Sequence, residues 1–124
     1  MARQAMESPG EGGPLPEAAD GTIDRAHLAH MTFGDQGLQR ELLELFDRQA
    51  AILIARMREA DAASAGALAH TLKGSALGIG AGGVVRAAEA VERVMMPGEQ
   101  AAALDDLARA VCAAQRTIAE MLRP

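Results

Sequence analysis

The chain has 124 residues, which is enough for one domain with a hydrophobic core but few for a second domain with a core of its own. Hydrophobic residues make up 49% of the sequence, aromatic residues only 2%, and the formal net charge is −5. Such a chain, with no Trp and no Tyr, lacks the basic footprint and stacking surfaces of nucleic-acid binding proteins, and no stretch is apolar enough to cross a bilayer.

Ala, Leu, Glu, Arg and Met dominate the sequence, and runs of β-branched and aromatic residues are missing, which predicts an all-α fold. Residues 1–21 are rich in glycine, proline and acidic residues, and we interpret them as a flexible N-terminal tail. The domain is then expected over residues 22–124. A short helix is predicted first, over residues 24–31, with Thr22 or Asp24 as its cap.

A longer helix is predicted from Asp35, its cap, to about Ala60, after a break at Phe33 and Gly34. Apolar residues recur along it at helical spacing and predict one core-facing side. The residues expected on that side are Leu38, Leu42, Leu45, Phe46, Ile52, Leu53 and Met57.

Asp61 can cap a third helix, which is expected to end at about Gly78 in a cluster of helix-breaking glycines: Gly78, Gly80, Gly82 and Gly83. A shorter helix should follow and end at Pro97-Gly98, with an apolar stripe of Val84, Ala87, Ala88, Val91 and Val94. A final helix is predicted over about residues 99–122, using Leu104, Leu107, Val111, Ala114, Ile118 and Met121. Four long amphipathic segments joined by short turns predict an antiparallel up-and-down four-helix bundle with a short extra N-terminal helix.

One segment of the third predicted helix carries residues suited to chemistry. Successive helical residues are about 100° apart, so Lys73, Gly74 and Leu77 should lie within roughly 60° of His70. The stripe that a bundle would bury lies on the opposite side and consists of Leu68, Leu72, Ser75 and Ile79. We therefore expect His70 to face solvent, with Lys73 and Gly74 as its neighbours on the same face.

A neutral imidazole is a competent nucleophile near neutral pH, which makes His70 a candidate phosphoacceptor. Lys73 could offer its positive charge to a phosphoryl group on the ring. Gly74 removes the side chain beside the histidine, so another protein can approach closely; a glycine inside a helix costs about 0.5–1 kcal/mol relative to alanine. Leu77 and Gly66 are further candidates for contact with that partner.

The string His70-Thr71-Leu72-Lys73-Gly74-Ser75, followed after four residues by Gly80-Ala81, resembles the signature of histidine-containing phosphotransfer (HPt) domains. The segment from residue 33 to residue 46 is similar to the second helix of that family. Val91-Glu92 resembles the family's apolar–glutamate pair on the helix after the histidine. The resemblance covers roughly residues 23–122, and Gly78 departs from it at a position where the family often has a larger residue.

The resemblance implies an up-and-down helical bundle that works as a phosphorelay intermediate in two-component signalling, and not as an enzyme with a nucleotide site. His70 would accept a phosphoryl group on its outward ring nitrogen and pass it to or from a receiver-domain aspartate, while Lys73 steadies the group and Gly74 leaves room for the receiver. The expected partners are the receiver domain of a response regulator, a hybrid histidine kinase, or both. Mg²⁺ would belong to the receiver, so no cofactor or metal is expected in this chain.

A cytoplasmic location is expected, because the sequence has one cysteine and no apolar signal-peptide segment. A monomer is assumed as the default oligomeric state. Cys112 is expected to be a small buried residue of the last helix, and Met95-Met96 to lie at the edge of the core. His27 and His30 could begin a metal site, but no third or fourth ligand is evident, so surface or packing roles are expected.

Two other functions remain open at this point. A helical adaptor could bind a signalling partner without any transfer, and a usable phosphoacceptor with a cation beside it argues for the relay instead. A metal-binding bundle enzyme would need Glu-x-x-His pairs that project inward, and the sequence contains none.

Overall fold

A computed structural model describes residues 21–124, and this part of the chain is helical, without a strand. The predicted N-terminal tail, apart from Gly21, lies outside the described residues and stays a prediction. The helices are α2 (Arg25–Met31), α3 (Gln36–Arg58), α4 (Ala62–Ile79), α5 (Gly82–Glu92) and α6 (Pro97–Leu122). The expected all-α class is confirmed. No helix within residues 21–124 is long and apolar enough to span a membrane.

Aspartate caps start the first three of these helices. The side chains of Asp24, Asp35 and Asp61 each accept a hydrogen bond from the backbone N–H three residues later, at 3.0, 3.0 and 2.8 Å. Such a bond satisfies one of the backbone donors that a helix N-terminus leaves without an intrahelical partner. It also lowers the pKa of Asp61 below the ordinary aspartate value. The predicted caps Asp35 and Asp61 are confirmed, and of the two candidates for the first helix, Thr22 and Asp24, the cap is Asp24.

Of the four glycines around the end of α4, only Gly80 interrupts the helical structure. Gly80 adopts φ +77°, a left-handed conformation that suits glycine, and it closes α4. Gly78 still belongs to α4, while Gly82 and Gly83 form the first turn of α5. The prediction of a four-glycine break was therefore wrong, because a single left-handed residue is enough to end one helix and start the next.

The boundary between the last two helices also differs from the prediction. α5 ends at Glu92, and Pro97 is the first residue of α6, where it had been expected to end the preceding helix. Proline is well tolerated at a first helical position because the N–H that it lacks has no intrahelical partner there.

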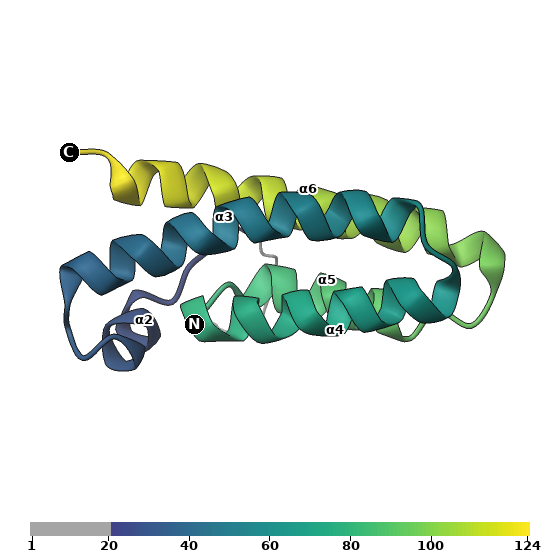
Figure 1. Cartoon of the computed structure of the whole chain (residues 1–124), viewed down its shortest axis with the longest axis horizontal. Helices are drawn as coiled ribbons and strands as arrows, with labels where there is room; N and C mark the ends of the chain where they lie inside the picture. Colours follow the sequence, from purple (N-terminus) through teal and green to yellow (C-terminus); the bar gives the residue numbers. More distant parts are fainter. Residues whose placement is uncertain (1–20) are drawn as a thin grey trace, which may run out of the picture.

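Each of the four long helices packs against two of the other three. α3 contacts α4, α4 contacts α5, α5 contacts α6, and α6 returns to contact α3, while the short α2 packs against α4 (Figure 1). The connections between the four long helices are short, at residues 59–61, 80–81 and 93–96.

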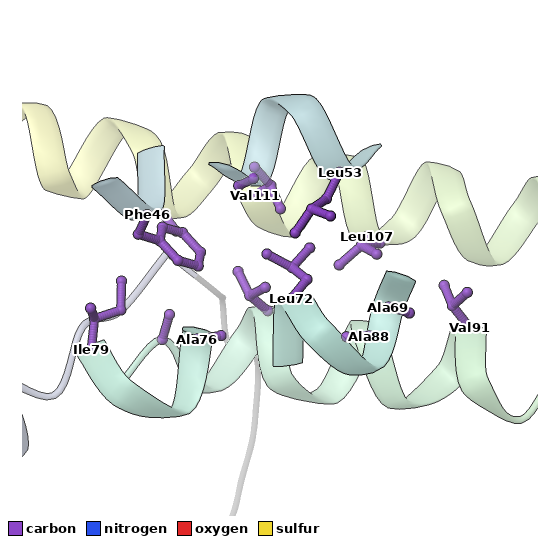
Figure 2. Close-up of a cluster of buried hydrophobic side chains, with 14 of the residues drawn as sticks. Phe46, Leu53, Ala69, Leu72, Ala76, Ile79, Ala88, Val91, Leu107 and Val111 are labelled. Carbon is purple, nitrogen blue, oxygen red and sulfur yellow. The ribbon is translucent and has the colours of Figure 1, made fainter. Parts of the chain in front are cut away.

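The core lies between these four helices (Figure 2). α4 contributes mainly small side chains, so its neighbours approach it closely, and larger residues from α3 and α6 fill the centre. The labelled core residues are Phe46, Leu53, Ala69, Leu72, Ala76, Ile79, Ala88, Val91, Leu107 and Val111. Because α4 buries one face completely, its opposite face is left to solvent.

The apolar face of α3 is placed differently from the prediction. Leu38, Leu45 and Ile52 were expected in the core but are exposed, whereas Leu43 and Ala50 are buried. The apolar surface of α3 is wider than the surface that α4 and α6 cover, so one edge of it remains open. The expected burial of other residues is confirmed for Phe46, Leu53 and Met57.

Two smaller expectations were also wrong. Cys112 is exposed, because its neighbour Val111 takes the position that faces the core. Met95 and Met96 are 87% and 61% exposed, since they lie in the connection between α5 and α6 and not on the core-facing side of a helix.

Candidate functional site

α4 presents the candidate site on its solvent face. The His70 side chain is 70% exposed, while Leu72, two residues further on, is fully buried. A helical rotation of about 200° separates two such residues, so burying one exposes the other. The cap at Asp61 and the packed face of α4 therefore fix the outward direction of His70.

Glu92 of α5 reaches across and holds one nitrogen of the His70 ring. The distance from His70 Nδ1 to Glu92 Oε2 is 2.8 Å. An ionised carboxylate can only accept hydrogen bonds, so Nδ1 is the ring nitrogen that carries the donated proton. In a neutral ring, this leaves the lone pair on Nε2.

The same carboxylate also binds Lys73. Glu92 Oε1 lies 2.9 Å from Lys73 Nζ, and Glu89 Oε2 lies 3.9 Å from the same nitrogen. The hydrogen bonds from Lys73 and then from His70 lower the pKa of Glu92 below the ordinary glutamate value. The site is therefore a row of side chains from two helices, with Glu92 between the imidazole and the ammonium group.

The role of these glutamates was missed at the sequence level. Glu92 was noticed only as part of an apolar–glutamate pair, and Glu89 was not singled out. A signal did exist, since His70 and Lys73 are three residues apart on α4 and Glu89 and Glu92 are three residues apart on α5. Residues at that spacing share one helix face, so two such pairs on adjacent helices can meet.

Gly74 follows His70 by one turn and is exposed. Within residues 21–124, and apart from its chain neighbours and the backbone of its own helix, a Cβ atom at this position would meet no atom within 4 Å, so packing in this part of the chain does not require glycine here. Leu77, one turn further, is 54% exposed. The surface from His70 to Leu77 is thus open to a second molecule.

Gly66 lies one turn before His70, on the side of α5. A Cβ atom at Gly66 would lie 4.0 Å from the Cα atom of Glu92. A hollow of about 410 Å³ opens there, next to the imidazole, and its lining residues are Ala62, Ala63, Gly66, Ala67, His70, Glu92 and Val94.

The open apolar edge of α3 borders the other side of α4. A groove of about 230 Å³ between α2, α3 and α4 is lined by Met31, Leu42, Leu45, Phe46, Gln49, Ser75, Gly78 and Ile79. Ser75 is partly exposed in this groove, not buried as its place on the apolar stripe had suggested, because α3 does not close over it.

The two histidines of α2 do not join the site. His27 Nε2 donates a hydrogen bond to the carbonyl oxygen of Leu77 at 2.8 Å, which connects α2 to the end of α4. His30 is exposed in the last turn of α2. Across residues 21–124, no group of three or more His, Cys, Asp or Glu side chains is placed to hold a metal ion.

In a comparison with protein families, the family model described as Hpt domain matches residues 38–123. This match covers more than half of the chain and extends from α3 to the end of α6, including the whole of α4 and α5. Neither the curated proteins nor the solved structures gave a match.

Proposed function

Since the chain belongs to the Hpt domain family, whose members carry phosphoryl groups on histidine in phosphorelay signalling, we propose that its phosphoacceptor is His70. In this proposal the group passes to or from the aspartate of a receiver domain in two-component signalling. The observation that carries the proposal is an exposed imidazole whose Nδ1 is held by Glu92 and whose Nε2 is left as the nucleophile.

The transfer needs no cofactor from this chain. The Nε2 lone pair attacks the phosphorus of the aspartyl phosphate, the P–O bond to the aspartate breaks, and its electrons return to that carboxylate. The proton on Nδ1 stays where it is, and Glu92 offsets the positive charge that the ring gains. Transfer in the other direction reverses each step. Mg²⁺ is expected only in the receiver.

We infer that α3, α4, α5 and α6 form an antiparallel up-and-down bundle, with α2 as an extra helix at its N-terminal side. The closed order of contacts and the connections of two to four residues support this arrangement. Such a bundle would hold His70 and its neighbours in a rigid arrangement. Rigidity matters here because phosphoryl transfer depends mainly on positioning and charge stabilisation.

The receiver would cover His70 and the surface around it. Lys73 would steady the phosphoryl group, Gly74 would give the receiver access to the ring, and Leu77 and Gly66 would contact it. The exposed apolar edge of α3, with Leu45 and Ile52 among its residues, adjoins this face and suits a partner's apolar contact. We expect the chain to act as a monomer in the cytoplasm.

Incubation with a phosphorylated receiver domain tests the proposal. The chain should gain an acid-labile, base-stable label, as expected of phosphohistidine, and the His70→Gln variant should fold normally and gain none. His30→Gln is a matched control, because His30 is an exposed histidine on α2 that lies outside the site. Normal labelling of His70→Gln would show that the assignment is wrong. Binding of the receiver without any label would favour a helical adaptor instead.

A further inference from the structure

The two glutamates of the site differ in what they touch. Among residues 21–124, Glu92 makes polar side-chain contacts with both His70 and Lys73, whereas Glu89 makes one with Lys73 only. One lysine and two glutamates give this cluster a net charge of −1 while the imidazole is neutral. The only cation of the cluster is therefore already shared by two carboxylates before a phosphoryl group arrives.

Phosphorylation of His70 would change the two contacts in opposite ways. The phosphorylated ring gains positive charge, so the hydrogen bond to Glu92 becomes more favourable. The phosphoryl oxygens bring negative charge one turn from Lys73, and they compete with Glu89 for its ammonium group. Glu89 makes no hydrogen bond with the His70 ring, so it gains nothing that would offset the weakened contact with Lys73.

We propose, building on the function proposed above, that Glu89 shifts the phosphoryl-transfer equilibrium by helping Glu92 to hold Lys73 on the α5 side of the site. Glu89 thereby makes phosphorylated His70 less stable relative to the aspartyl phosphate of the receiver. When the group leaves, the N–P bond breaks, its electrons return to Nε2, and a P–O bond forms with the aspartate. Lys73 then regains its full contact with both glutamates, which favours departure.

The size of the effect follows from the exposure of the pair. Glu89 is 40% exposed, and its oxygen lies 3.9 Å from Lys73 Nζ, so this is a surface ion pair with solvent close by. Exposed ion pairs change equilibria by about twofold to fivefold, and salt weakens them. Glu89 is therefore a positioning residue whose influence acts through Lys73.

The measurement is the equilibrium distribution of phosphoryl groups between this chain and a receiver domain, approached from both directions. Glu89→Gln should shift the distribution toward His70 by about twofold to fivefold at low salt, and by less in about 1 M salt. Glu120→Gln removes the same charge from an exposed position of α6 and should shift nothing. Thermal unfolding of the Glu89→Gln variant should match that of the unmodified chain.

A double-mutant cycle tests whether the effect passes through Lys73. In a Lys73→Ala background, Glu89→Gln should no longer shift the distribution. An unchanged distribution in Glu89→Gln alone, an equal shift in the Lys73→Ala background, or an equal shift in Glu120→Gln would each overturn the proposal. These outcomes all require that the unmodified chain is labelled; if it is not labelled at all, the proposed function itself fails.

Discussion

The residues on the two faces of α4 are explained by different requirements. On the buried face, small alanines and Leu72 are what close contact with α3 and α5 requires, and each residue is explained by packing. On the exposed face, the chain places Gly74 and the 54% exposed Leu77, and Gly78 lies at the edge of this face, partly exposed in the groove beside α3. Helix stability alone would favour almost any residue other than glycine or proline at the glycine positions. The residues that the fold does not need are thus the ones that a partner could use.

The largest expected effect comes from damage to the buried face. Leu72→Ala should lower the free energy of unfolding by about 2–5 kcal/mol, because it leaves a cavity among side chains that cannot fully collapse. Leu77→Ala removes the same atoms from the exposed face and should change stability by no more than about 0.5 kcal/mol. Urea unfolding of the two variants measures the contrast. Equal losses would mean that the two faces are not as different as their burial indicates.

A second effect is expected where α4 ends. Gly80 and Gly34 both have positive φ, +77° and +74°, so alanine should cost about 1–2 kcal/mol at either position. Only at Gly80 would the new Cβ atom also approach Asp24, whose backbone oxygen and nitrogen would lie at 2.9 and 3.0 Å. The Asp24 N–H donates to the Gly80 carbonyl at 2.9 Å, so this contact attaches α2 to α4.

Gly80→Ala should therefore destabilise the chain more than Gly34→Ala does. It should also increase hydrogen exchange of the α2 amides, whereas Gly34→Ala should leave the attachment of α2 to α4 intact. Equal losses in the two variants, with α2 equally protected, would show that the contact with Asp24 adds nothing.

The sequence predicted those features of the fold that depend on neighbouring residues. Asp24, Asp35 and Asp61 marked helix starts because a cap needs only its own first turn. The outward direction of His70 also followed from the helical period and one apolar stripe. Both conclusions depend on a few consecutive residues and on no other helix.

The sequence failed where the outcome depends on how two helices are rotated relative to each other. Leu43 and Leu45 of α3 are about 200° apart around the helix, so which of the two leucines is buried depends on the side of α3 that its neighbours cover. The contact between His70 and Glu92 depends in the same way on the rotation of α5 against α4. Composition and periodicity within a single helix do not determine that rotation.

The smallest expected effect on stability comes from replacing the glycines Gly74 and Gly78 of α4. It tests the difference between the two faces directly, because a side chain at Gly74 should favour the helix but hinder phosphoryl transfer. Gly74→Ala and Gly78→Ala should each raise the free energy of unfolding by about 0.5–1 kcal/mol, since both positions are helical and a Cβ atom there would clash with no neighbouring element of residues 21–124. Gains at both positions would show that neither glycine serves the stability of α4.

A larger side chain at Gly74 separates the two roles. Gly74→Leu should slow phosphoryl transfer from a receiver domain about fivefold or more, because it crowds a protein interface next to the ring. Labelling by phosphoramidate, a donor small enough to avoid the new side chain, should stay unchanged in the same variant. Equal slowing with both donors would mean that the leucine disturbs the imidazole itself, and the space beside His70 would then not be there for the partner.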